Sequence, residues 1–392
     1  MPYDPHAPNG RPDLVCFSHL KWDLVFQRPQ HLLTRFAAEG RVFYVEEPNW
    51  GDGPARLEVD RREGGLHVVR PHLKWWDGVE DVDAVMRGMV DRLFREHDIG
   101  ECVLWYYTPM ALAYSRHLHG LATVYDCMDE LSAFRDAPPA MLERERELLA
   151  RADLVFTGGA SLYEAKRGLH PGVHLFPSSI DAPHFRQARG AVAEPADQAE
   201  IARPRIGFYG VIDERLDLEL LRDAAAARPE WQWVILGPVA KIGQDELPRL
   251  PNLHYPGARG YAELPRWLAG WDVAVLPFAR NESTRFISPT KTPEYLAAGR
   301  PVVSTPIPDV VRPYGDAGVV AIEGTAEGFV SAIEAALARG GGERAEWLRA
   351  VDGMLDGMSW DRTWSGMAEL LDGAVARRGD RPRSTGRAAT LD

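Results

Sequence analysis

The chain has 392 residues, of which 45% are hydrophobic and 26% are charged, an ordinary globular composition at a length that accommodates two or three domains. The formal net charge of -12 argues against nonspecific nucleic-acid binding, and the 3 cysteines have neither a disulfide framework nor metal-site spacing, which fits a reducing cytoplasm. The polar, proline-rich N-terminus is unlike a signal peptide, and no apolar run approaches the roughly 18 residues of a spanning helix, so we expect a soluble cytoplasmic protein, at most peripheral to the inner face of a membrane.

The first half of the chain alternates short apolar runs with longer helical stretches. Strands are expected at 13–17, 41–45, 66–70, 102–106, 122–126, 153–157 and 173–176, and helices at 27–39, 83–97, 139–150 and 159–168. Such alternation is typical of βαβ units on a parallel sheet. Residues 1–185 therefore predict a Rossmann-like domain, in which ligands bind at the carboxyl ends of the strands.

The connection after the first strand, FSHLKWDLVFQRPQHLL (17–33), is unusually long and polar for this position. It holds Ser18, His19, Trp22, Arg28 and His31. One interpretation is a cleft loop that contacts substrate. The alternative is a surface loop, with His31 simply on the following helix.

The third strand is followed by PHLKWWDG (71–78), in which Trp75 and Trp76 stand beside Lys74. Tryptophans beside cations suit a membrane interface or a lipid-linked acceptor. Arginines near the C-terminus could add attraction to anionic lipid; they are Arg377, Arg378, Arg381, Arg383 and Arg387. The alternative is that one tryptophan packs in the core, the tail is a solvated linker, and the negative net charge repels anionic surfaces.

The fifth strand ends in VYDCMDE, which places Asp126 and Asp129 at its carboxyl end. A carboxylate there could orient or deprotonate an acceptor hydroxyl. Either residue could instead cap the next helix, a common role for aspartate.

Residues 186–203 are polar, rich in alanine and proline, and without periodicity, which predicts a linker. The alternation then resumes, with strands expected at 205–210, 231–237, 253–257, 272–277, 301–305 and 318–323, and helices at 213–227, 261–269, 290–298, 325–338 and 343–355. We predict a second Rossmann-like domain over 204–358, facing the first across a cleft. A final helix at 359–376 and a disordered tail at 377–392 complete the chain.

The second domain opens with GFYGVIDERLDLELL (207–221), which lacks the G-x-G-x-x-G string of a dinucleotide fingerprint. The turn at Gly210 could bring backbone close to a phosphate, and Arg215 follows within reach. The alternative is a plain tight turn. LGP (236–238), at the next strand end, could flank a base or be only a turn.

The segment SPTKTPEYLAAGRPVVST (288–305) carries the strongest signal. Ser288 suits an N-cap, Pro289 suits the first helical position, and Gly299 can close the helix in a left-handed conformation. A short buried strand should follow.

Two polar residues of this segment suggest a ligand. Free amides at a helix N-terminus favour anions, so Thr290 and Lys291 predict a diphosphate cradle. Glu294, one turn on, is placed to hold ribose hydroxyls. The alternative is an exposed Lys–Glu pair three residues apart, which is common on helices.

This segment, late in the second of two tandem Rossmann-like domains, resembles the GT-B glycosyltransferases, and within them family 4 (glycosyl transferase group 1). CFSHLKWDLVFQRPQHLL and VYDCMDE resemble a narrower branch, the teichuronic-acid-biosynthesis type. LFPSSIDAPHF (175–185) is similar to the segment that closes the first domain in that group, and MSWDRTW (358–364) to the start of its last helix, which crosses back to the first domain.

The resemblance implies a nucleotide-sugar donor on the second domain and a hydroxyl acceptor on the first, the acceptor being a saccharide, lipid-linked or a small molecule. It implies no metal and no cofactor. Glu294 matches the acid that holds the donor ribose, and Ser288, Pro289, Thr290 and Lys291 match the diphosphate-facing helix start. The expected donor-binding set adds Gly210 and Arg215; the expected catalytic residues are Asp126, His19 and Asp129; and the acceptor side is expected to hold Trp22, Arg28, Trp75 and Trp76.

The sequence departs from the family pattern in two places. Phe286 stands where an E-x7-E motif has its first acid, and SHLKWD replaces a Gly-Gly loop. We expect a metal-independent hexosyltransferase acting in cell-envelope polysaccharide, glycolipid or glycoconjugate biosynthesis. A nucleotide-sugar epimerase on the same fold and a non-catalytic nucleotide-sugar binder are the alternatives.

Overall fold

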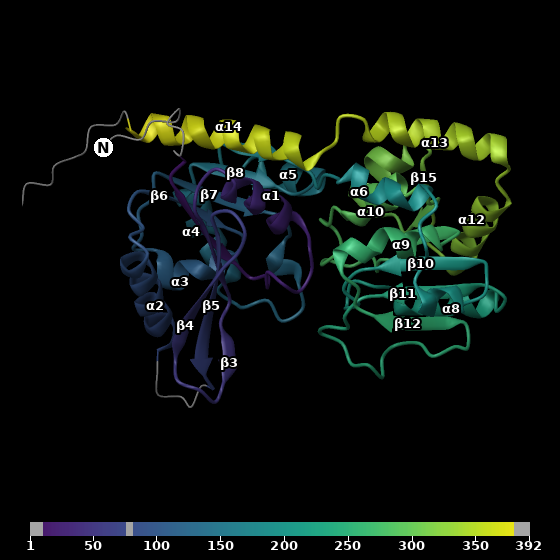
Figure 1. The fold of residues 1–392 in the computed structure, drawn as a ribbon, viewed down its shortest axis with the longest axis horizontal. Helices are drawn as coiled ribbons and strands as arrows, with labels where there is room; N and C mark the ends of the chain where they lie inside the picture. Colours follow the sequence, from purple (N-terminus) through teal and green to yellow (C-terminus); the bar gives the residue numbers. More distant parts are fainter. Residues whose placement is uncertain (1–10, 76–80, 380–392) are drawn as a thin grey trace, which may run out of the picture.

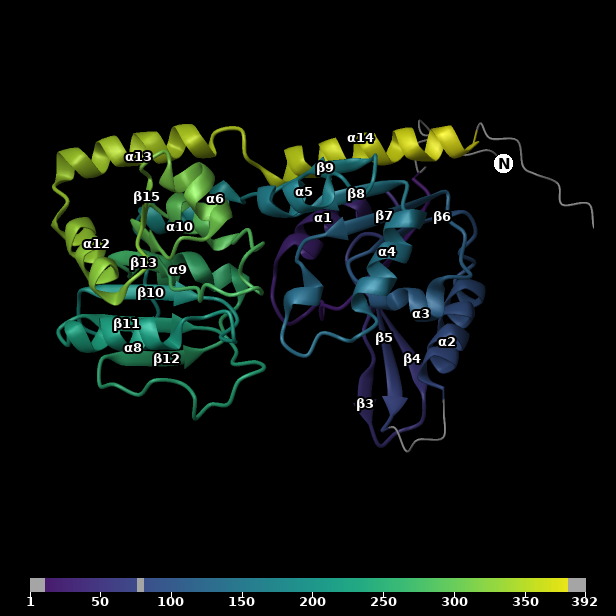
Figure 2. The same ribbon diagram turned by 180° about the vertical axis from the view of Figure 1, so that it is seen from behind.

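A computed structural model describes residues 11–75 and 81–379 of the chain (Figure 1). These residues form two α/β domains, each built on its own parallel sheet, as the alternation of strands and helices predicts. The two sheets lie side by side along the molecule, and the helices cover their faces (Figures 1 and 2).

The first sheet has the strand order β3-β5-β2-β1-β6-β7-β8-β9, and β4 pairs with β5 outside this path. Its strands are β1 (Asp13–Ser18), β2 (Val42–Glu46), β3 (Asn49–Gly51), β4 (Arg56–Arg61), β5 (Leu66–Lys74), β6 (Cys102–Tyr106), β7 (Ala122–Cys127), β8 (Leu154–Thr157) and β9 (Val173–Leu175). The helices of this domain are α1 (Arg28–Ala37), α2 (Val82–Glu96), α3 (Leu112–Ser115), α4 (Met141–Arg151) and α5 (Ala160–Lys166), with one-turn segments η1 (Pro109–Ala111) and η2 (Leu131–Ala133).

The central strands of this sheet are buried along their whole length, which explains why they appear in the sequence as continuous apolar runs. The sequence prediction missed β3 and β4. Strand β4, RLEVDR, alternates exposed and half-buried residues and pairs antiparallel with β5 at the edge of the domain. Its charges suit an edge strand, because they discourage pairing with another chain.

The second sheet has the order β12-β11-β10-β13-β14-β15, all in parallel pairs. Its strands are β10 (Arg205–Tyr209), β11 (Gln232–Leu236), β12 (Leu253–Gly257), β13 (Val273–Leu276), β14 (Val302–Ser304) and β15 (Val320–Ile322). The helices are α8 (Leu218–Ala227), α9 (Leu264–Ala269), α10 (Lys291–Ala297), α11 (Pro308–Val310), α12 (Ala326–Ala338) and α13 (Gly341–Leu355), with η4 (Tyr261–Glu263) and η5 (Val311–Gly315).

Three expectations about the linker and the helix boundaries need correction. The expected linker at 186–203 contains η3 (Gln187–Arg189) and α7 (Ala196–Ala199), and α6 (Ala182–Arg186) precedes it. Helix α10 begins at Lys291 with Thr290 as its N-cap, so Ser288 is not the cap. The last helix, α14 (Trp360–Gly379), continues into the segment expected to be a disordered tail.

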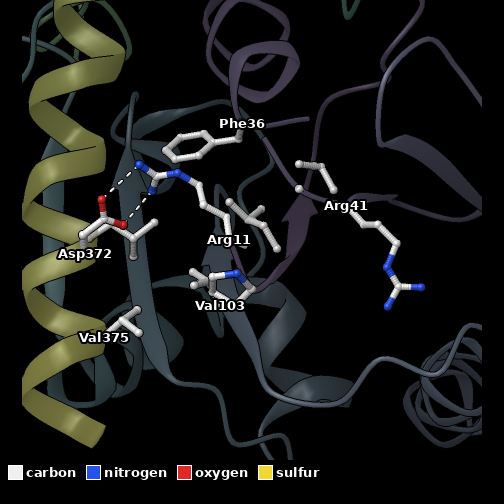
Figure 3. Close-up of a pocket in the computed structure, with 11 residues that line it drawn as sticks. Arg11, Phe36, Arg41, Val103, Asp372 and Val375 are labelled. Carbon is white, nitrogen blue, oxygen red and sulfur yellow. Dashed lines mark hydrogen bonds and ion pairs between the residues drawn. The ribbon is translucent and has the colours of Figure 1, made fainter. Parts of the chain in front are cut away.

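Helix α14 lies along the first domain, while α13 lies along the second (Figure 1). Its apolar residues Trp360, Met367 and Leu371 join the core cluster that contains β1 and β6. Arg11 fixes the helix further, because its guanidinium donates to the two carboxylate oxygens of Asp372 at 2.7 and 3.0 Å (Figure 3). The C-terminal helix is therefore part of the first domain's core.

The chain crosses between the domains twice. Phe176 packs against the first-domain core, and Ile180 belongs to the second-domain core. Farther along, Met358 packs against the second-domain core, and Trp360 belongs to the first. Each crossing thus takes only a few residues.

Candidate active site between the two domains

The carboxyl ends of both sheets face a cavity of about 920 Å³. The first domain lines it with residues 19–27, which follow β1, and with residues 128–138, which follow β7. The second domain contributes the turn after β10, the turn after β11, the loop after β12 and the start of α10. Loops at the carboxyl ends of parallel strands are where this architecture binds ligands.

Lys291 lies across the turn that follows β10. A Cβ atom at Gly210, whose φ is +150°, would stand 2.3 Å from Lys291 Cε, so a larger residue there would displace the lysine side chain from its position. Burial lowers the pKa of Lys291. Within residues 11–75 and 81–379 its ammonium has no ion-pair partner, and its neighbours in the cavity wall are Ser288, Pro289 and Thr290. A half-buried cation that no carboxylate pairs at ion-pair distance is suited to bind an anion.

Arg215 lies on the same side of the cavity and is held by Asp213. Its Nε and Nη2 donate to the two carboxylate oxygens of Asp213 at 3.0 and 2.7 Å. Asp129, from the first domain, interacts electrostatically with both cations. Burial raises the pKa of Asp129, and the positive charges of Arg215 and Lys291 oppose this rise. The sequence pattern did not single out Asp213, because its role depends on the conformation of the Arg215 side chain, which turns back onto the Asp213 carboxylate.

Glu294 is buried one turn into α10 and accepts a hydrogen bond from the Tyr209 hydroxyl at the end of β10. Burial raises its pKa to about 7, against the opposing effects of this hydrogen bond and of Lys291. The backbone N–H of Tyr209 in turn donates to the Tyr295 hydroxyl at 2.9 Å. Tyr209 was missed in the sequence, although an aromatic residue inside GFYG at a strand end was an available signal.

His19 lines the first-domain side of the cavity. Burial lowers its pKa to about 4, so the imidazole is neutral at physiological pH. Its Nδ1 is buried and has no hydrogen-bond partner in the described part of the chain. Trp22 lines the same wall and packs edge-on against Tyr44, with ring centroids 4.9 Å apart.

Asp126 and Arg28, predicted at the catalytic and acceptor sides, do not line the cavity. The two side chains are 0% and 1% exposed and bind each other: Arg28 Nε and Nη2 lie 3.0 and 2.9 Å from the two carboxylate oxygens. Arg28 also donates to the Phe176 carbonyl at 2.8 Å. This buried ion pair ties α1 to β7, and no helix in the described part of the chain has Asp126 as its N-cap.

Trp75 also lies outside the cavity lining. It is 60% exposed at the end of β5 and stacks on Trp50 of β3, with ring centroids 6.4 Å apart. Trp76 lies outside the described residues. The remaining predicted residues surround one cavity; they are His19, Trp22, Asp129, Gly210, Arg215, Ser288, Thr290, Lys291 and Glu294.

Phe134 connects the two sides of this cavity. This first-domain ring lies beneath two second-domain cations, 4.5 Å from Lys241 Nζ and 5.5 Å from Arg215 Cζ. Phe286, where the family motif has its first acid, packs against the apolar core of the first domain. In the part of the chain that the structure describes, no group of three or more His, Cys, Asp and Glu side chains is arranged to hold a metal ion.

The comparisons with known proteins agree with this geometry. The family model for glycosyl transferases group 1 matches residues 203–339. A protein of Bacillus subtilis (strain 168), provisionally named teichuronic acid biosynthesis glycosyltransferase TuaH, is 27% identical over 285 residues, or 67% of this chain and 70% of the relative.

The second domain of this chain therefore matches the group 1 glycosyltransferases, and the chain as a whole has the GT-B fold. Sucrose-phosphate synthase from Thermosynechococcus elongatus superposes with a TM-score of 0.71 at 14% identity, over 94% of this chain and 100% of that one. Anabaena HepE, in complex with UDP and glucose, has a TM-score of 0.66 at 13% identity, over 92% and 100%. The predicted GT-B fold is confirmed, and the match to the predicted family covers residues 203–339. Among the described residues, no helix combines the length and the apolar character needed to cross a bilayer.

Proposed function

We propose that this glycosyltransferase moves a hexose from a nucleotide-diphosphate-sugar donor on the second domain to a hydroxyl acceptor on the first. The observation that carries the proposal is Lys291 at the start of α10, which no carboxylate among the described residues pairs, beside Gly210 and one turn from Glu294. A diphosphate would bind the lysine and the free amides, and a ribose would bind Glu294. Two similar structures hold related ligands: an E. coli trehalose-6-phosphate protein is bound with UDP-2-fluoro glucose, and Anabaena HepE with UDP and glucose.

The proposed chemistry uses the charges around the cavity. The bond between the anomeric carbon and the diphosphate oxygen breaks, and its electron pair leaves with the diphosphate. Lys291 and Arg215 stabilise this developing charge, so we propose that the reaction needs no metal ion or other cofactor. The acceptor oxygen bonds to the anomeric carbon, and its proton passes to His19, which is neutral and on the acceptor side.

The Bacillus relative supports a setting for the reaction. A role in cell-envelope polysaccharide, glycolipid or glycoconjugate biosynthesis fits its name. One observation favours a second candidate, a nucleotide-sugar binder without activity: Phe286 replaces an acid of the family motif and packs on the other domain.

A panel of nucleotide sugars, each with and without hydroxyl acceptors, tests the proposal. A donor should raise the melting temperature, and nucleotide should be released mainly when an acceptor is present, equally with and without EDTA. A sugar changed without an acceptor would indicate an epimerase. Thermal stabilisation without turnover would indicate the binder.

Glu294→Ala should weaken donor binding by about 1.5–3 kcal/mol, the range for hydrogen bonds to a charged group. Isothermal titration calorimetry with the stabilising nucleotide sugar measures this change. Glu282→Ala is the control, because Glu282 is exposed and does not line the cavity. Unchanged affinity in Glu294→Ala would rule out the ribose contact.

Donor affinity should also rise with pH. Glu294 has its pKa raised to about 7, and ribose hydroxyls donate to the carboxylate form, so the affinity should increase by about tenfold between about pH 6 and pH 8. A nucleotide sugar is the suitable titrant, because its diphosphate diester does not titrate in this range. Glu294→Gln should give a flat profile; a profile with the wild-type slope would assign the titration to another group.

We also propose a weak peripheral membrane contact through the Trp50–Trp75 pair, which is exposed at the end of β3 and β5. Tryptophan side chains favour the interface of a bilayer. The protein should sediment with anionic vesicles at low salt, and Trp50→Ala with Trp75→Ala should abolish this. Protein that stays in the supernatant would exclude the contact.

A further inference from the structure

The first-domain wall of the cavity is largely apolar. Leu24 and Phe26, in the loop between β1 and α1, are 62% and 42% exposed while lining the cavity. Other apolar side chains continue the wall across the ends of β6 and β7; they are Met110, Met128, Leu131 and Phe134. Clustered apolar residues that face a cavity usually mark a binding surface.

The charged groups on this wall are poorly suited to a phosphorylated sugar. Lys21 donates to the Glu47 carbonyl and lies 3.6 Å from the Glu46 carboxylate, so its charge is already balanced. The Asp23 carboxylate is paired with Arg62 and Arg70. Arg135 is the cation on this wall that has no ion-pair partner in the described ranges. Recognition of a phosphate ordinarily draws on several convergent donors.

We propose, on the premise of the glycosyltransferase function above, that the natural acceptor is amphipathic. Its hydroxyl-bearing polar head reaches His19, and its apolar aglycone lies along Leu24 and Phe26, out to the rim of the cavity. The high exposure of Leu24 follows from this arrangement, because the aglycone covers that side chain only in the complex.

Binding of matched glycosides to the full-length chain tests the proposal independently of turnover. Octyl, phenyl and methyl β-glucoside share one head and differ only in the aglycone, whereas glucose 6-phosphate has no aglycone and carries a charge at C6. Titration calorimetry, with the octyl glycoside kept below its micelle concentration, should show octyl or phenyl glucoside binding at least about tenfold tighter than methyl glucoside. Tighter octyl binding would indicate a lipid chain, and tighter phenyl binding would indicate an aromatic group.

Leu24→Asp should remove most of this preference. Leu169→Asp is the matched control, because Leu169 is 60% exposed and lies outside the cavity, and it should leave the preference unchanged. Equal binding of all three glucosides, tighter binding of glucose 6-phosphate, or equal losses in the two variants would overturn the proposal. In parallel, the melting temperature of the unaltered protein is measured with nucleotide sugars, which reports on the donor site alone. Stabilisation by a nucleotide sugar without any preference among the glucosides would overturn this inference and leave the proposed function standing.

Discussion

Replacing Asp126 by alanine is expected to lower the free energy of unfolding by about 3–5 kcal/mol. The Arg28 guanidinium, 1% exposed, would lose a partner that accepts hydrogen bonds from both Nε and Nη2. An unpaired charge in a sheet–helix interface cannot be hydrated as it is in the unfolded chain. The change should therefore exceed that of any surface ion pair in this protein.

Equilibrium unfolding in urea, followed by circular dichroism, measures this difference. Asp223→Ala is the control, because its pair with Arg222 is about half exposed on both sides, and removing a solvent-screened surface pair costs little. The double change Arg28→Met with Asp126→Leu removes both charges and should recover much of the loss. A loss in Asp126→Ala no larger than that in Asp223→Ala would mean that water reaches Arg28.

Lys291→Met is expected to lower kcat by about 100- to 1000-fold, the usual effect of removing one group that stabilises charge developing in a transition state. Methionine keeps the length of the side chain and so its packing over Gly210. Because the charge on the diphosphate grows as the bond breaks, the loss should fall mainly on kcat, with a smaller effect on donor affinity.

Nucleotide release with the donor and acceptor found in the panel measures both quantities. Lys74→Met is the matched control, because Lys74 is exposed at the end of β5 and outside the cavity. Wild-type kcat in Lys291→Met would remove Lys291 from the proposed mechanism. A loss confined to donor affinity would make it a ground-state binding residue only.

The sheets could be predicted from the sequence because a strand buried on both faces appears as an unbroken apolar run, as in VFYVE of β2 and LVFT of β8. Strand β4 lacks this signal, because it is an edge strand whose pairing with β5 depends on the tertiary fold. The start of α10 could be located for a different reason: helix-end signals and a cation near free amides are local features.

The direction of Asp126 could not be predicted in the same way. Side chains alternate between the two faces of a strand, and Asp126 shares its face with Val124, on the side of the cluster that includes α1 residues. Its partner Arg28 is 98 residues away in the chain. Tyr209 and Asp213 were missed for a related reason, since each gains its role from a side chain that tertiary folding brings close.

The two short crossings between the domains, at 176–180 and 358–360, lie toward the same edge of the molecule (Figure 1). Two bodies joined by a pair of pivots retain chiefly one easy motion, a rotation about the line through both pivots, whereas twisting and sliding would strain one link or the other. The domains should therefore open and close by rotation about a single axis that passes through both crossings. Such a rotation separates the two domains most at the side of the cavity farthest from the crossings. Each time the domains close, Lys291 and His19 return to the same relative position.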